Sequence, residues 1–181
     1  VDTSASFTDD LPTFKAQATG PTGIISTLRN AIPNSKFGVG TFEDYPISPF
    51  GNPAVGDAAY RQNIDLTFDT VAVEGVITGL FTRDGADLPQ SQLAALFQTA
   101  TGAGQVIPAP HAVASIPAGQ QANFRAAATK IILLWTDADA HQPGDPGDIP
   151  YPGPSFADTI NAILALDPPK VLHLLGRYWS L

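Results

Sequence analysis

The stretch VDTSASFTDD, residues 1–10, decides how the fold is interpreted. Its oxygen-bearing side chains occur at alternate positions and then as an adjacent pair: Asp2, Ser4, Ser6, Asp9 and Asp10. Hard divalent cations bind oxygen ligands of this kind. Val1 precedes the first carboxylate and a helix-like segment follows the pair, so the stretch is interpreted as a turn that leaves the end of a strand. Open α/β sheets bind their ligands at such turns.

The composition is that of one globular domain over residues 1–181, with hydrophobic residues making up 44% of the chain. No apolar run approaches the roughly 18 residues that span a bilayer, so we expect no membrane insertion by this domain. Lys and Arg number 9 and Asp and Glu 17, and the net charge of −8 argues against a nucleic-acid partner and suits bound cations. The absence of cysteine excludes disulfides and thiolate metal sites.

Helical and extended patterns alternate along the chain. Apolar spacing predicts helices over 10–32, 71–80, 91–99 and 156–166, the first of them interrupted at Gly20-Pro21 and the third capped by Ser91. Strands are predicted over 36–42, 64–68, 131–135 and 171–175. The run 131–135 is continuously apolar, which is typical of a strand buried on both faces. Loops rich in Gly, Pro or Asp connect these elements.

This order predicts an α/β fold with a doubly wound, mostly parallel sheet and helices on both faces, as in Rossmann-like domains. The turn at residues 1–10 requires a strand before it, and the chain ends shortly after a predicted strand. We therefore expect a strand at the N-terminus and a final helix to be lacking. The chain would then be part of a larger protein, or would pair with a segment outside this sequence.

Two further loops offer oxygen ligands beside strands or helices. One holds Asp84, Asp87, Pro89 and Gln90; the other holds Thr136, Asp137 and Asp139 directly after the run 131–135. Parallel strands place the loops at their carboxyl ends along one edge of the sheet. We therefore expect these loops to converge with the turn at residues 1–10.

Several stretches match one known family in order along the chain. Besides residues 1–10, they are FEDYPISPF at 42–50, GADLPQ at 85–90 and LLWTDA at 133–138. From the first residue to about Leu175, the chain resembles a von Willebrand factor A domain, and within that class it most resembles the I-like domain of integrin β subunits. The resemblance implies a metal-ion-dependent adhesion site in an extracellular or cell-surface protein.

The resemblance also implies three metal sites. The primary site, for Mg²⁺ or Mn²⁺, would use Asp2, Ser4 and Ser6 with Asp137 as its last acidic residue. The adjacent site, for Ca²⁺, would use Asp9 and Asp10. A third, synergistic Ca²⁺ site would draw on a final set of residues: Asp44, Asp87, Pro89 and Gln90. Two departures from the family affect this third site, because Gln90 replaces a bridging Glu and Gly85 replaces an Asn ligand. The cysteine-bonded specificity loop of animal integrins is also absent, and a short Gly/Pro stretch takes its place.

The chemistry of the primary site follows from its residues. Mg²⁺ requires near-octahedral oxygen geometry and keeps several waters. Asp2 supplies one direct carboxylate, the two serines supply neutral oxygens and Asp137 can act through water. The cation is then under-neutralised, with a position open for an Asp or Glu carboxylate of a partner. Gln90 removes one more negative charge, so we expect weaker intrinsic metal affinity and a stronger preference for an anionic ligand.

Plainer interpretations of these residues stay open at the level of sequence. The first motif could cap a helix, and a helix dipole alone would favour the acidic pair behind it. The loop carboxylates could be ordinary turn residues. Outside these ligand sets, we expect three acidic side chains to be exposed to solvent: Asp139, Asp145 and Asp148. We also expect that none of the three histidines binds a metal ion: His111, His141 and His173. Trp135 and Trp179 are expected to serve packing.

The sequence therefore predicts a binding module rather than an enzyme. Its ligand would be a protein or matrix component that exposes an Asp or Glu. One alternative is a structural domain whose loops Ca²⁺ merely stiffens. The other is a Mg²⁺-dependent phosphohydrolase, which is disfavoured because the sequence shows neither a base–orienter pair nor a phosphate-binding loop.

Overall fold

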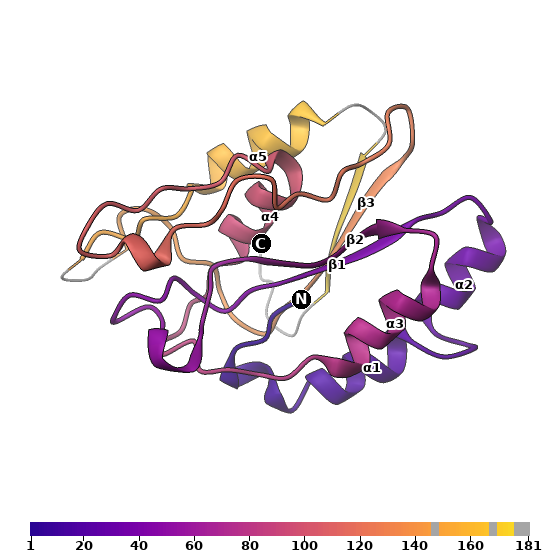
Figure 1. The fold of residues 1–181 in the computed structure, drawn as a ribbon, viewed down its shortest axis with the longest axis horizontal. Helices are drawn as coiled ribbons and strands as arrows, with labels where there is room; N and C mark the ends of the chain where they lie inside the picture. The colour runs from indigo at the N-terminus through magenta and orange to yellow at the C-terminus, as the bar shows by residue number, and fades with distance from the viewer. Residues whose placement is uncertain (146–148, 167–169, 176–181) are drawn as a thin grey trace.

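The computed structural model describes residues 1–145, 149–166 and 170–175 of the chain (Figure 1). Its helices are α1 (Leu11–Ala18), α2 (Ile24–Ala31), α3 (Thr70–Gly79), α4 (Gln92–Thr101) and α5 (Phe156–Ala165). Its strands are β1 (Phe37–Thr41), β2 (Arg61–Thr67), β3 (Lys130–Trp135) and β4 (Lys170–Leu175). The protein is thus a mixed α/β structure, and each predicted helix and strand is found close to its expected bounds. Asp148 and Trp179 lie outside the described residues.

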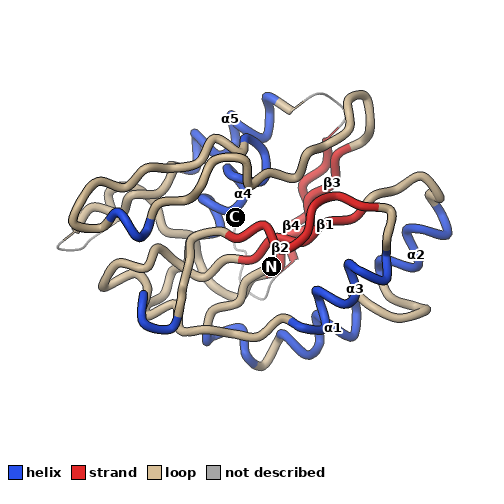
Figure 2. Tube along the Cα trace, in the orientation of Figure 1, coloured by secondary structure: helices blue, strands red, loops and turns tan. Residues whose placement is uncertain are grey.

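The described strands form two pairs rather than one continuous sheet. β1 pairs with β2 in the antiparallel sense, and β3 pairs with β4 in parallel. The opening segment lies between the pairs: the backbone N–H of Asp2 donates to Trp135 at 2.8 Å, and that of Thr3 donates to Phe42 at 2.9 Å. The expected doubly wound, mostly parallel sheet is therefore seen only as this smaller, mixed arrangement, drawn in red in Figure 2.

Helices lie on both sides of the strands (Figures 1 and 2). On one side α1, α2 and α3 contribute to an apolar core that includes Phe14, Ile25, Val73 and Val39 of β1. On the other side α4 and α5 pack in a second core with Leu134 of β3 and with the loop aromatics. Complete burial of one such side chain stabilises a fold by about 1.5–3 kcal/mol. These two cores hold the strand ends, and with them the loops, in fixed positions.

Local sequence accounts for the ends of the helices. The helical segment predicted over 10–32 is interrupted as expected, because Gly20 adopts a φ of 82° that L side chains rarely take. α5 begins with a capping box in which Ser155 and Asp158 bond each other's backbone N–H groups. Ser91 differs from expectation: it occupies the N-cap of α4, but its hydroxyl makes no capping bond. The hydroxyl instead donates to the backbone oxygens of Glu43 and Ala59, at 2.9 and 3.1 Å.

The strand expected to be buried on both faces is only partly buried. Ile131 of β3 is 43% exposed, whereas Leu134 is buried. A hollow of about 700 Å³ lies beside this strand, and its lining includes Val39, Ile131 and Trp135. The lining of the hollow includes every residue of the apolar run from Ile131 to Trp135, so the run is not closed off by packing along its whole length. Trp135 packs against Phe14, with ring centroids 4.9 Å apart, as expected for a core residue.

One buried carboxylate connects the loops at the carboxyl ends of the strands. Glu43 lies directly after β1, is fully buried, and accepts from Arg61 at 2.5 Å and from Arg83 at 3.1 Å. It also accepts from the Thr3 hydroxyl at 2.6 Å and from the N–H of Ala58 at 3.0 Å. Glu43 thus joins the opening segment, β2 and the loop that begins near Arg83.

Replacing Glu43 by Ala should destabilise the protein strongly. Two arginines would lose their shared partner in a largely desolvated site, and such losses cost about 3–5 kcal/mol. The measurement is urea unfolding of chelator-treated protein. Asp65→Ala, an exposed carboxylate on β2, is the matched control and should change the free energy of unfolding by less than about 0.5 kcal/mol. Equal effects of the two substitutions would contradict the role assigned to Glu43.

Candidate metal sites

The opening turn and the loop after β3 bring five oxygen-bearing side chains together. We call this group the primary cluster: Asp2, Ser4, Ser6, Thr136 and Asp137. One oxygen of Asp2 accepts from the N–H and hydroxyl of Ser4, at 2.8 and 2.7 Å, and its other oxygen accepts from the Thr136 hydroxyl at 2.7 Å. The Ser4 and Ser6 hydroxyl oxygens lie 3.0 Å apart, and Ser6 donates to Asp137 at 3.0 Å. The predicted convergence of these two loops is therefore confirmed, while metal binding by them stays a prediction.

The primary cluster is closed at one end and open at the other. Asp2 has no exposed surface, whereas Ser6 is exposed and Asp137 is half-buried. Burial raises the pKa of Asp2 above its ordinary value of 3.8, and hydrogen bonds from Ser4 and Thr136 oppose that rise. A cation placed among these oxygens would stabilise the ionised form of Asp2. The exposed end leaves room for water or for a ligand.

Asp9 and Asp10 show no such convergence. Asp9 is exposed, and Asp10 is the N-cap residue of α1, where its side chain makes no capping bond. Among the described residues, neither they nor the carboxylates of the primary cluster belong to a group of three or more His, Cys, Asp or Glu side chains that could hold a metal ion. Their position at the start of α1 suits the helix dipole, which is the plainer interpretation of this pair. An adjacent Ca²⁺ site here stays a prediction.

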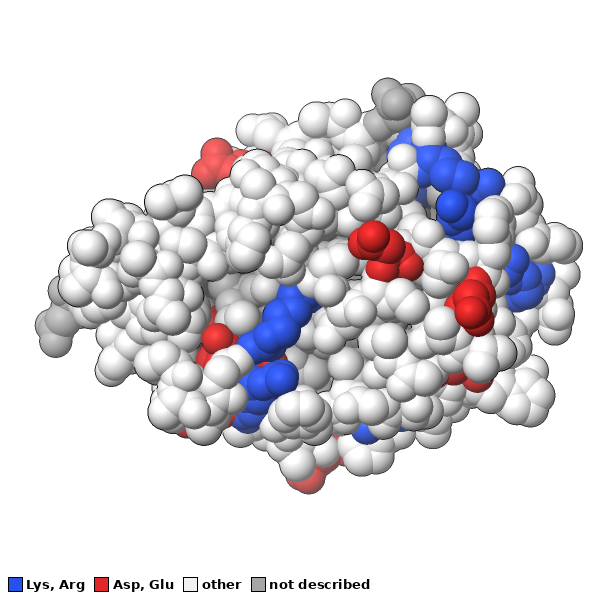
Figure 3. All heavy atoms as spheres, viewed as in Figure 1, with Lys and Arg blue, Asp and Glu red and all other residues white. Residues whose placement is uncertain are grey.

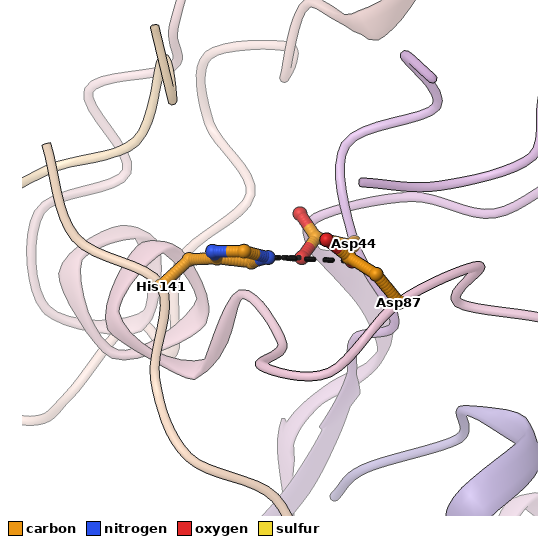
Figure 4. A group of neighbouring side chains, drawn as sticks. All are labelled: Asp44, Asp87 and His141. Atoms are coloured by element: carbon orange, nitrogen blue, oxygen red, sulfur yellow. Dashed lines mark hydrogen bonds and ion pairs between the residues drawn. The ribbon is translucent and has the colours of Figure 1, made fainter. Parts of the chain in front are cut away.

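A second group, which we call the histidine cluster, consists of Asp44, Asp87 and His141 (Figure 4). Nε2 of His141 lies 3.4 Å from Oδ2 of Asp44 and 3.3 Å from Oδ1 of Asp87. Asp44 and His141 are buried, while the Asp87 side chain is 31% exposed. The three residues come from the loop after β1, the loop before α4 and the loop after β3. This buried cluster could hold a metal ion.

Sequence reasoning missed His141. It expected the histidines to lie apart from the metal ligands and expected Asp145 to be solvated. In the structure the Asp145 carboxylate lies 3.0 Å from Nδ1 of His141 and is only partly exposed. Asp139, by contrast, is exposed as expected. The one available signal was position, since His141 follows the same strand as Asp137 and so belongs to the same edge.

Gln90 closes the loop between the two clusters. Its side chain is 1% exposed, and its Nε2 donates to the backbone oxygens of Gly85 at 2.9 Å and Asp87 at 2.6 Å. Two donated bonds fix the amide orientation, so Oε1 must point the other way, where it has no hydrogen-bond partner. Pro89 precedes Gln90 in this loop and stays a predicted carbonyl ligand.

Gly85 cannot be replaced by Asn without rearrangement. Its φ is 66°, and an added Cβ would lie 2.7 Å from Oε1 of Gln90 and 2.8 Å from Cβ of Ser4. Oε1 of Gln90 and the side chain of Ser4 therefore both border the small space beside Gly85. Gly85 and Gln90 thus belong to one tightly closed loop, held by the Gln90 amide. The loop places a buried oxygen beside the primary cluster.

Burial also dominates the electrostatics of the histidine cluster. It raises the pKa of Asp44 well above 3.8, and the nearby Asp87 adds to that rise. It likewise raises the pKa of Asp87, although the hydrogen bond from His141 acts in the opposite direction. Two carboxylates in a desolvated site favour any cation that can lie between them.

Comparison with models of known protein families and with curated proteins gave no match. Among the described residues, each helix is too short or too polar to pass through a bilayer.

Gln90→Glu should weaken the metal-free fold and strengthen Mg²⁺ binding. The new carboxylate would face two backbone oxygens that now accept from an amide, at a cost of about 1–3 kcal/mol. In the presence of Mg²⁺ the added charge should raise affinity, which calorimetric titration would measure. Gln98→Glu, which adds the same charge at a buried site on α4, away from the loop that carries Gln90, should leave Mg²⁺ affinity unchanged. An unchanged Mg²⁺ affinity in Gln90→Glu would refute this account of the loop.

Asp44→Asn should stabilise the metal-free protein at neutral pH. Because the pKa of Asp44 is raised from 3.8, the unfolded state releases this proton first as pH rises, and the free energy of unfolding falls through that range. Asn cannot ionise, but its oxygen can still accept from the Tyr45 N–H, which lies 2.5 Å from Oδ1. Thermal unfolding with chelator from about pH 4 to about pH 7 should show a smaller decline in Tm than wild type. A decline equal to that of wild type would contradict the assigned cost of ionising Asp44.

Proposed function

We propose that this chain is a divalent-cation-dependent recognition module of the von Willebrand factor A type, similar to an integrin β I-like domain. It would bind an Asp or Glu of a protein or matrix partner through Mg²⁺ or Mn²⁺ held at the primary cluster. The observation that carries the proposal is the convergence of Asp2, Ser4, Ser6 and Asp137 at the carboxyl ends of β1 and β3. The position of the opening segment between those strands supports a doubly wound topology.

The donor set suits a cation that keeps an open position. Asp2 is the buried carboxylate, the two serine hydroxyls are neutral, and Asp137 at the exposed end can bind through water. Mg²⁺ requires about six oxygens, so waters complete the shell, and one of them can be exchanged for a ligand carboxylate. A single direct carboxylate leaves the ion with residual positive charge, which favours an anionic ligand.

The charge distribution supports dependence on a metal. On the face drawn in Figure 3, one group of basic side chains lies left of centre beside acidic side chains, and another gathers at the upper right, toward α2 and the loop before β3. There Arg29, Lys36 and Arg125 lie 5.6, 4.9 and 5.7 Å from the Phe68 ring centroid. The carboxyl-end loops carry both acidic clusters in a chain of net charge −8, and the arginines beside them, Arg61 and Arg83, are already paired with Glu43. An acidic ligand would be repelled at this edge unless a cation were bound there.

The contacts of the serines favour binding over catalysis. Among the described residues, the Ser4 hydroxyl bonds Asp2 and Ser6, and the Ser6 hydroxyl bonds Asp137. Neither serine is therefore paired with a histidine that could remove its proton, as nucleophilic catalysis requires. We propose, from the same resemblance, an extracellular or cell-surface location within a larger protein.

A second candidate function is a metal-stabilised structural domain without ligand binding. The histidine cluster favours it, because a cation there would connect three loops that are otherwise held by Glu43 and Gln90. Such a domain would gain stability from cations by mass action and would bind no acidic partner. The experiment below separates the two candidates.

Peptides selected on the immobilised protein from a displayed random library should contain Asp or Glu when selection uses Mg²⁺ and elution uses a chelator. Asp2→Asn should reduce both Mg²⁺ affinity and peptide binding at least about tenfold, equal to about 1.4 kcal/mol. Asp139→Asn, an exposed carboxylate in the loop after β3, is the matched control and should bind as wild type does. Peptides without acidic residues, or peptide binding that persists in chelator, would favour the structural candidate.

A further inference from the structure

We propose that Asp44, Asp87 and His141 form a site for a first-row transition-metal ion, with Zn²⁺ as the ion it fits best. The resemblance to integrin β I-like domains implied only oxygen ligands and Ca²⁺ in this region, whereas the structure adds an imidazole nitrogen. The proposal does not depend on the function proposed for the primary cluster. It concerns a separate set of ligand atoms, which lie within 4.8 Å of one another.

The spacing of the ligand atoms fits a tetrahedral ion. Two ligands bound to Zn²⁺ at about 2.0–2.1 Å in a tetrahedron lie about 3.3 Å from each other. The Nε2 atom of His141 lies 3.4 Å from Oδ2 of Asp44 and 3.3 Å from Oδ1 of Asp87. Oδ2 of Asp44 is buried and faces Nε2 of His141 rather than solvent. Burial raises the pKa of Asp44, and a hydrogen bond from the Tyr151 hydroxyl, outside the cluster, opposes that rise.

The imidazole is held in the orientation of a metal ligand. Nδ1 of His141 lies 3.0 Å from the carboxylate of Asp145, which also accepts from the N–H of Gln142 at 2.8 Å. In the metal-free protein Nε2 faces two carboxylates and can carry a proton; with an ion bound at Nε2, the Asp145 carboxylate would hold the remaining ring proton on Nδ1, as in carboxylate–histidine–zinc arrangements. The ring also stacks on Tyr151, with centroids 4.6 Å apart, and meets Phe50 edge-on at 5.1 Å. The ring is thus fixed before any ion binds.

The donor set selects against hard cations. Ca²⁺ takes six to eight oxygens and Mg²⁺ demands an octahedron of oxygens, whereas one nitrogen with two carboxylates suits Zn²⁺ and its neighbours in the first transition row. The partly exposed Asp87 leaves a route for the ion and a fourth position for water. In the absence of a metal ion, Nε2 of His141 can instead carry a proton. The experiment below distinguishes the protonated ring from the metal-bound ring.

Zn²⁺ in this cluster would stiffen the loop that carries Gln90. Gln90 donates its backbone N–H to Asp139 at 2.9 Å and accepts at its backbone oxygen from the N–H of His141 at 2.9 Å. The loops bearing Asp87 and His141 are therefore already side by side. A metal bond between their side chains would lock the unpartnered Oε1 of Gln90 beside Ser4.

Calorimetric titration of chelator-treated protein tests the site with Zn²⁺, Ca²⁺ and Mg²⁺ as probes. Wild type should bind one Zn²⁺ here, and His141→Gln should lower that affinity at least about tenfold with much less effect on Ca²⁺. His111→Gln, which removes a histidine from a different loop, should change neither. Asp2→Asn should retain Zn²⁺ binding while losing Mg²⁺ affinity, so failure of this site and failure of the primary cluster would be distinguishable.

Three further measurements keep the test decisive if His141→Gln does not fold. Asp145→Asn, which alters only the residue that positions the imidazole, should lower Zn²⁺ affinity about tenfold or more. In wild type, the ¹⁵N resonance of His141 Nε2 should shift on Zn²⁺ addition, and Co²⁺ should give the intense visible bands of a four-coordinate ion. Unaltered Zn²⁺ affinity in His141→Gln would overturn the proposal. A ¹⁵N chemical shift of Nε2 that remains the shift of a protonated nitrogen in excess Zn²⁺ would also overturn the proposal.

Discussion

The buried carboxylate of Glu43 is the interaction on which the arrangement of the loops depends. It is shared by Arg61, Arg83 and the hydroxyl of Thr3, so one side chain fixes three segments of the chain. Thr3 lies between Asp2 and Ser4, and Glu43 precedes Asp44 directly. The positions of both clusters are therefore set by a carboxylate that belongs to neither. A charge buried without such partners would be costly, so the loops gain a single preferred arrangement rather than merely added stability.

The two clusters differ in chemistry although they share an edge of the molecule. The primary cluster offers hydroxyls and carboxylates with an exposed end, which suits a hard ion that exchanges its ligands. The histidine cluster offers nitrogen and carboxylates around a fixed ring, which suits a tighter ion. Gln90 lies between them and joins their loops through its amide and its backbone. We propose that the cation at the primary cluster binds the partner's carboxylate and that the cation at the histidine cluster stabilises the loop that carries Gln90.

Local pattern predicted much of the fold, because spacing and turn residues act over short stretches of chain. The interruption at Gly20 and the strand at 131–135 followed from such signals. The approach of Ser6 to Asp137 was expected for a different reason, the rule that loops at the carboxyl ends of parallel strands share one edge of the sheet. The misses depend on contacts between distant segments. His141 meets a carboxylate 54 residues away in sequence, and no spacing in a single chain encodes that approach. Similarly, the loss of the family's Glu at Gln90 is visible in the sequence, but the two carbonyls that its amide satisfies are not.

The most direct test of the central claim is a crystal structure of the chain grown with saturating Mg²⁺, refined for the coordination of any ion at the primary cluster. The account predicts an ion about 2.1 Å from an Asp2 oxygen and from both serine hydroxyls, with waters completing an octahedron. Binding of the ion would replace the present contacts, in which the two serine oxygens lie 3.0 Å apart and Ser4 donates to Asp2. Those contacts persisting unchanged in saturating Mg²⁺, with no ion among them, would contradict the account.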